Sequence, residues 1–180
     1  TNGGCNSGGG RFQSIATVTG TQFISNATNG GNAGGAWFLG SATITNTQFM
    51  SNTAAQAGGA QFQSAGVLFN AQFLNNTSSG AAGGLQLVSG GLVVNSLFAR
   101  NKASTNGVDV YILGGTAQLI HLTLVSPTVA TSSGIYVANG TVYITNTLIT
   151  SRTVGIERVS GSVTENYNLF YNTTTNLSGT

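Results

Sequence analysis

Residues 34–52 read GGAWFLGSATITNTQFMSN, and residues 58–76 read GGAQFQSAGVLFNAQFLNN. The two stretches have the same length and share GGA at the start, Asn and Gln-Phe near the end, and a final Asn. A Phe followed three residues later by Asn recurs at steps of 24 to 26 residues: Phe23 and Asn26, Phe49 and Asn52, Phe73 and Asn76, Phe98 and Asn101. Apolar residues continue the register at Leu124, Ile149 and Phe170. A fixed period of this length indicates a solenoid.

Apolar residues alternate with others inside each repeat, as in Ala36-x-Phe38 and Ala60-x-Phe62. This spacing is typical of β-strands. Short strands separated by Gly, Asn and Ser turns predict stacked coils, whose equivalent residues lie about 4.8 Å apart. We therefore expect an all-β fold, a right-handed parallel β-helix (β-solenoid) of about seven coils of about 25 residues each.

The expected domain organisation is simple. Residues 9–172 form the β-helix, residues 1–8 a flexible Gly-rich leader, and residues 173–180 a polar tail. Cys5, the single cysteine, lies in the leader and has no partner for an internal disulfide.

The composition excludes several classes of protein. Charged residues make up 4% of the chain, against roughly 25% in an ordinary soluble domain. Five Lys and Arg residues are too few to neutralise a phosphate backbone, so we expect no nucleic-acid partner. The sequence contains no run of 18 apolar residues, so we expect no membrane-spanning helix. Low charge suits a solenoid, because stacked coils place like residues above one another and equal charges would repel.

Two columns of Asn are expected to stabilise the stack. The repeat Asn residues follow the Phe anchors: Asn26, Asn52, Asn76 and Asn101. The Asn ladder precedes the anchors, at Asn46, Asn70, Asn95 and Asn146. Stacked Asn side chains pass hydrogen bonds from coil to coil and tolerate the left-handed backbone of tight turns. His121 takes the ladder position in the fifth coil, so we interpret it as a substitute for Asn.

The repeats resemble the right-handed parallel β-helices of the pectin-lyase-like superfamily. More narrowly, the pairing of Gly-Gly-Ala/Leu with Phe-x-x-Asn is similar to the repeats of polymorphic outer-membrane proteins and related bacterial surface passenger domains. The resemblance covers residues 9–172 and is clearest in the first four coils. It implies the fold, and an extracellular or cell-surface location, but no particular activity, because this scaffold carries enzymes, adhesins and inert fibres.

Candidate catalytic groups are scarce. The only acids are Asp109, Glu157 and Glu165, whereas the pectin-degrading members of the superfamily use clusters of Asp. Asp109 and Glu157 are expected in one column, but two coils and about 10 Å apart, which is a poor carboxylate pair for hydrolysis. We expect no catalytic residues, no metal site and no cofactor.

Strand alternation predicts two outward surfaces. A candidate glycan-binding face follows the first strand of each coil: Arg11, Trp37, Gln61, Gln86, Asp109, Tyr136 and Glu157. A candidate assembly patch follows the second strand: Val67, Phe69, Leu92, Val94 and Ile120. Exposed apolar surface of this kind marks a protein contact.

The expected function is that of a non-catalytic, extracellular structural and adhesive β-helix, either a subunit of a self-assembling surface filament or part of a longer passenger. Its expected partners are other copies of itself, packed head to tail or laterally. The alternative is a carbohydrate-binding or carbohydrate-degrading module, whose partner would be a cell-surface polysaccharide.

Overall fold

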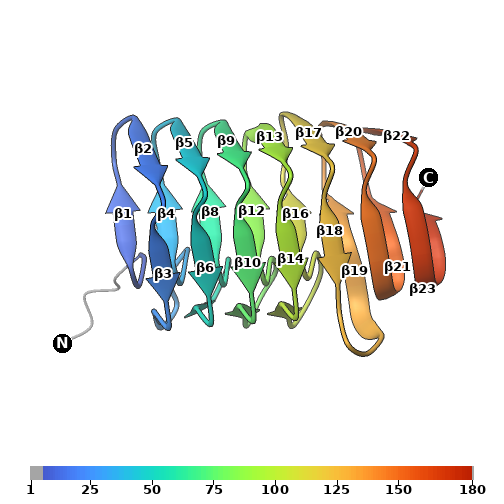
Figure 1. Ribbon diagram of the computed structural model, residues 1–180, viewed down its shortest axis with the longest axis horizontal. Helices are drawn as coiled ribbons and strands as arrows, with labels where there is room; N and C mark the ends of the chain where they lie inside the picture. The colour runs from blue at the N-terminus through green and yellow to red at the C-terminus, as the bar shows by residue number, and fades with distance from the viewer. Residues whose placement is uncertain (1–5, 180) are drawn as a thin grey trace.

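The computed structural model describes residues 6–179 as a stack of coils whose strands pair in parallel with those of the next coil (Figure 1). Equivalent residues such as Phe38, Phe62 and Leu87 follow one another at steps of 24 and 25 residues. The described residues contain strands and turns but no helix. The predicted all-β solenoid of about seven coils, with a spacing of about 25 residues, is confirmed.

Each coil contributes strands to three long faces, called here the first, second and third sheets, and the early coils add a fourth sheet. The first and third sheets join through β21 into one 13-stranded sheet. The first sheet contains β1 (Gly10–Phe12), β4 (Ala36–Phe38), β8 (Ala60–Phe62), β12 (Leu85–Leu87), β16 (Val110–Ile112), β19 (Ala130–Val137) and the end of β21 (Leu148–Arg158). The second sheet contains β2 (Ala16–Thr19), β5 (Ala42–Thr45), β9 (Gly66–Phe69), β13 (Gly90–Val94), β17 (Thr116–Ile120), β20 (Thr141–Thr145) and β22 (Ser162–Asn166).

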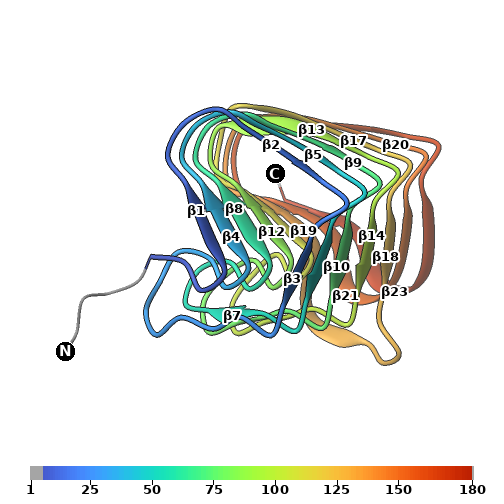
Figure 2. The same cartoon turned by 60° about the vertical axis from the view of Figure 1, so that its left-hand side comes forward.

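The third sheet contains β3 (Gln22–Ile24), β6 (Gln48–Met50), β10 (Gln72–Leu74), β14 (Leu97–Ala99), β18 (Thr123–Val125), the start of β21 and β23 (Leu169–Ser178). The fourth sheet contains only β7 (Thr53–Ala54), β11 (Thr77–Ser78) and β15 (Lys102–Ala103). In Figure 2 the first three sheets enclose the core, and the fourth lies on a loop on the far side of the core from the second sheet.

Two columns of Phe form most of the core in the early coils. The rings of Phe23, Phe49, Phe73 and Phe98 stack at centroid distances of 4.8 to 5.0 Å. The rings of Phe12, Phe38 and Phe62 stack at 4.6 and 4.7 Å. Offset stacks of this kind add to the free energy of burial, by about 0.5–1.5 kcal/mol per pair. Aliphatic side chains continue both columns, because Leu87 and Leu124 take the next positions.

The repeated Gly-Gly motif is explained by the close approach of consecutive coils. A Cβ added at Gly58 would lie 2.4 Å from the Gly83 carbonyl oxygen and 2.6 Å from the Thr77 nitrogen. Only Gly permits a backbone approach of this kind. The motif therefore marks where each coil bends back toward the first sheet.

The two ends of the solenoid extend beyond the predicted boundaries. Ser7 already bridges to Ala33 and the Gly8 amide donates to the Ala33 carbonyl, so stacking begins inside the predicted leader. At the other end, residues 173–178 belong to β23 and pair with β21, so they are not a tail. The last coils have 21-residue steps because β21 and β23 run straight through the corner that carries the fourth sheet in earlier coils. Cys5 lies outside the described residues.

Candidate functional site

The outward column of the first sheet has the predicted register except at Asp109. Gln86 pairs with Tyr111, and Tyr111 pairs with Tyr136, so Tyr111 holds the fifth position. Asp109 is instead fully buried. The fifth coil replaces Gly-Gly with Val108-Asp109, whose carbonyls accept the amides of Gly84 and Leu85. The even 25-residue steps from Gln86 to Tyr111 and Tyr136 are a feature of the sequence that indicates Tyr111, and not Asp109, as the outward residue.

This column is not a continuous solvated face. Gln61 and Gln86 are only 3% and 7% exposed. The Gln61 amide nitrogen donates to Gln86 and to Gln56, which belongs to the loop that precedes β8. The middle of the candidate glycan-binding face is therefore covered by the chain itself.

The aromatic rings of the column also have little free surface for stacking. The Arg11 guanidinium lies over the Trp37 indole, 5.0 Å from its centroid. Tyr111 and Tyr136 stack on each other at 5.0 Å with an interplanar angle of 17°. Burial raises the pKa of Tyr111, and the neighbouring Tyr136 adds to the increase. Sugar rings stack on aromatic faces, and these faces already contact protein groups.

We expect the substitution Trp37→Ala to leave glycan binding unchanged, because the indole face is already occupied by Arg11. A glycan array probed with the wild-type and variant chains measures this. Loss of a glycan signal that the wild-type chain gives would show instead that the column binds carbohydrate.

The Asn ladder lies at the turn between the second and third sheets, and its members share a left-handed backbone. The φ angles lie between 49° and 55° at Asn46, Asn70, Asn95, His121 and Asn146. The Asn70 amide nitrogen donates to the Asn46 side-chain oxygen at 3.1 Å. The Asn146 amide nitrogen lies 3.0 Å from His121 Nε2, which accepts its hydrogen. His121 therefore has the contact of a ladder residue.

The repeat Asn residues form a second ladder inside the solenoid. The amide nitrogens of Asn26, Asn52 and Asn76 each donate to the side-chain oxygen of the next Asn, at 3.0 to 3.1 Å. The backbone amides of the same three residues donate to the same oxygens. The amide nitrogens of Asn52 and Asn76 also donate to the carbonyls of Phe23 and Phe49 in the preceding coil, so each of these side chains connects three coils.

The interior ladder ends on a buried ion pair. The Asn101 amide nitrogen donates to Asp109 Oδ1 at 3.1 Å. The other carboxylate oxygen accepts from Arg152, from Nε at 3.1 Å and from Nη2 in a shorter contact. Both charged side chains are 0% exposed. The carboxylate is the strongest acceptor available for the last amide of the chain of donors.

Arg152 stands three residues after Ile149, which is the position that repeat Asn residues hold in earlier coils. Its Nη1 donates to the carbonyls of Thr150 and Ser151, so most of the guanidinium is satisfied. Burial raises the pKa of Asp109, while the Arg152 charge and the hydrogen bonds from Arg152 and Asn101 lower it. The sequence analysis did not predict the ion pair of Asp109 and Arg152, although an Arg at a repeat Asn position is a departure that indicates a buried partner.

The candidate assembly patch has the register that the sequence predicts. Val67, Leu92 and Gln118 form one outward column. Phe69, Val94 and Ile120 form the other. Phe69 is 37% exposed. Tyr143 stacks on Gln118 in the next coil and is 44% exposed. The structure thus places an apolar surface on the second sheet over the third to fifth coils, with Gln118 as its polar member.

An apolar column on the third sheet was not predicted. It consists of the residues that directly follow the Phe anchors and their equivalent in the fifth coil: Ile24, Met50, Leu74, Ala99 and Val125. Ile24 is 46% exposed and the others are half-buried. These residues hold the same place in each repeat, and this regularity is the feature of the sequence that indicates the column. The third and second sheets meet at the Asn ladder, so the two apolar surfaces flank one edge of the solenoid (Figure 2).

The remaining chemistry-bearing groups are dispersed. Residues 6–179 contain no group of three or more His, Cys, Asp or Glu that could hold a metal ion. In the same range no helix is long and apolar enough to cross a membrane. Glu165 lies beside Ile144 in the core column of the second sheet, at the exposed end, and accepts from Asn168.

Comparisons of the chain with protein-family models, curated proteins and solved structures found no match.

Proposed function

We propose that the chain is a non-catalytic structural and adhesive β-solenoid that associates with copies of itself. The observation that carries this proposal is the apolar surface over the third to fifth coils of the second sheet. Single apolar side chains are common on protein surfaces, whereas contiguous apolar patches mark interaction sites. Here the patch lies on the face of a sheet, and two sheets pack face to face at a separation of about 10 Å.

The chemistry of the second sheet favours a second copy of the same chain as the partner. Strands β2, β5, β9, β13, β17 and β20 contain no charged residue. Two such faces meet without electrostatic repulsion and without burying an unpaired charge. An identical face also offers the same axial spacing of about 4.8 Å, so its side chains interdigitate along the whole contact.

We expect Phe69→Asp to weaken self-association by at least about tenfold, because a carboxylate within the patch would be desolvated without a partner. Sedimentation velocity over a range of concentrations measures the effect. Thr17→Asp is the matched control, since Thr17 is an exposed outward residue of the same sheet, in the first coil and outside the patch. Equal association of the wild-type chain and Phe69→Asp would contradict the proposal.

Two further considerations support an extracellular, non-catalytic role. The likeness of the repeats to those of bacterial surface passengers favours the cell exterior. Asp109 is enclosed with Arg152 and so lies out of reach of a substrate, which leaves Glu157 without the expected carboxylate in its column. A carbohydrate-degrading role is the weaker proposal for this reason, and self-association remains the one that the surface chemistry favours.

A further inference from the structure

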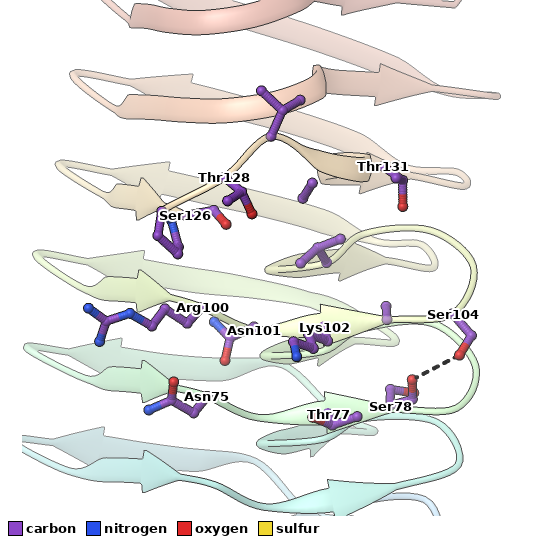
Figure 3. Close-up of a pocket in the computed structure, with 15 residues that line it drawn as sticks. Asn75, Thr77, Ser78, Arg100, Asn101, Lys102, Ser104, Ser126, Thr128 and Thr131 are labelled. Carbon is purple, nitrogen blue, oxygen red and sulfur yellow. Dashed lines mark hydrogen bonds between the residues drawn. The ribbon is translucent and has the colours of Figure 1, made fainter.

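We propose that the pocket beside β15 binds an acidic saccharide, one or two sugar rings that carry a carboxylate or sulfate group. The pocket has a volume of about 740 Å³, within the usual range for small-molecule sites. Figure 3 shows its residues at three levels along the solenoid: Asn75 and Thr77 on one coil, Arg100 and Lys102 on the next, and Ser126, Thr128 and Thr131 beyond them.

The pocket exists because the fifth coil does not continue the fourth sheet. β15 is the last strand of that sheet, and no described strand stacks on it. Pro127 stands where earlier coils have a repeat Asn. It lacks the side-chain oxygen that accepts from the coil before and the backbone N–H that donates to the next coil. The chain from Ser126 to Thr131 therefore arches away and leaves a hollow above Lys102.

Two of the five cationic residues of the chain line this hollow. Arg100 and Lys102 are both exposed. The ion pair recorded among the described residues joins Asp109 and Arg152, so neither pocket cation has a described acidic partner. Uncompensated positive charge at a concave site attracts anions.

Both cations depart from the repeat. Arg100 has a φ of 56° at a corner where the earlier coils have Ser25, Ser51 and Asn75. A long side chain is rare in this left-handed region, where small polar residues are favoured. Lys102 follows Thr53 and Thr77 in its column. The backbone conformation of Arg100 belongs to the repeat, but stacking does not explain why two long cationic side chains stand at these positions.

The other lining residues indicate what the anion is attached to. Thr77, Ser104 and Thr128 offer hydroxyl groups, and Asn75 offers an amide. Hydroxyls and amides both donate and accept hydrogen bonds, which matches the hydroxyls of a sugar. Arg and Lys supply charged donors for a carboxylate or sulfate. Together these groups fit an acidic saccharide better than a small inorganic anion.

Nuclear magnetic resonance titration of the ¹⁵N-labelled chain tests the proposal. The probes are a disaccharide containing glucuronic acid, a sulfated disaccharide, their uncharged counterpart, and sodium sulfate. We expect a charged disaccharide to shift the amide signals of Lys102, Ser104 and Thr128, and the uncharged one to bind at least about tenfold more weakly. The relative effect of the two charged sugars identifies which anion is preferred. Equal binding of the uncharged sugar or of sulfate alone, or shifts confined to other coils, would overturn the proposal.

The double variant R100Q/K102Q should lose at least about tenfold in affinity. The control R158Q removes a charge from another coil and should bind within about twofold of wild type, since surface charges beyond a Debye length are screened. Equal loss in both variants would mean a non-specific charge effect and would also overturn the proposal. The test is independent of self-association, because it is read in dilute solution and the fourth sheet lies across the core from the second sheet (Figure 2).

Discussion

Arg152→Met should lower the free energy of unfolding by about 3–5 kcal/mol at neutral pH, because it leaves the buried Asp109 carboxylate without its countercharge. Met replaces the aliphatic part of the Arg side chain but not its guanidinium, which also donates to the Thr150 and Ser151 carbonyls. A double variant therefore separates the effect of the unpaired charge from these losses. Urea unfolding followed by circular dichroism gives the value. The double variant D109N/R152M should recover most of it, because Asn at position 109 still accepts from the Asn101 amide and carries no charge.

The free energy of unfolding of the Arg152→Met chain should also depend on pH, and the sign of this dependence follows from the burial of Asp109. Burial raises the pKa of Asp109 in the folded chain, and removing Arg152 takes away the main opposing effect. A folded carboxyl with a raised pKa binds protons more tightly than the unfolded one, so stability increases as the pH falls. The Arg152→Met chain should therefore regain stability relative to wild type between neutral pH and the ordinary carboxyl value of 3.8. A loss that is independent of pH, or equal losses in the single and double variants, would show that Asp109 is not the cause.

Asn76→Ala should lower the free energy of unfolding by about 4 kcal/mol, since four buried hydrogen bonds contribute roughly 1 kcal/mol each. The Asn76 amide nitrogen donates to the Phe49 carbonyl and to Asn101, and its oxygen accepts from the backbone and side-chain nitrogens of Asn52. The substitution leaves these partners buried and unpaired. Chemical denaturation again provides the measurement.

Asn26→Ala is the matched control for the interior ladder. Asn26 stands at its first position and is half-buried, and among the described residues its side chain makes one hydrogen bond, to the Asn52 oxygen. That oxygen also accepts from the Asn26 backbone, which the substitution preserves. We expect a loss of only about 1 kcal/mol. Similar losses for Asn26→Ala and Asn76→Ala would contradict a ladder whose contribution comes from its buried hydrogen bonds.

The features that the sequence predicted are the ones that repeat. Phe and Asn columns, and the outward pairs of the second sheet such as Thr43 with Val67, follow from a period of two along strands and a fixed step between coils. Each coil repeats the same local choice, so errors in one coil are corrected by its neighbours. This is why the fold and the register of the second sheet could be predicted without a structure.

The features that sequence reasoning missed lie where the period changes. The fifth coil lacks Gly-Gly, so nothing local fixed its register, and Asp109 was placed two residues from its position in the stack. The burial of Gln61 and Gln86 depends on the conformation of a neighbouring loop, which the periodicity of the sequence does not predict. The contact of Arg152 with Asp109 joins residues 43 positions apart, and alternation cannot predict it. The pocket near Pro127 arises from the same break in the repeat.

Electron microscopy of the purified wild-type chain beside Phe69→Asp tests self-association through the second sheet most directly. The proposal predicts ordered assemblies for the wild-type chain, with a width that is a multiple of one solenoid, and dispersed particles for the variant at the same concentration. Dispersed single solenoids in both samples, or the same ordered assemblies in both, would contradict it.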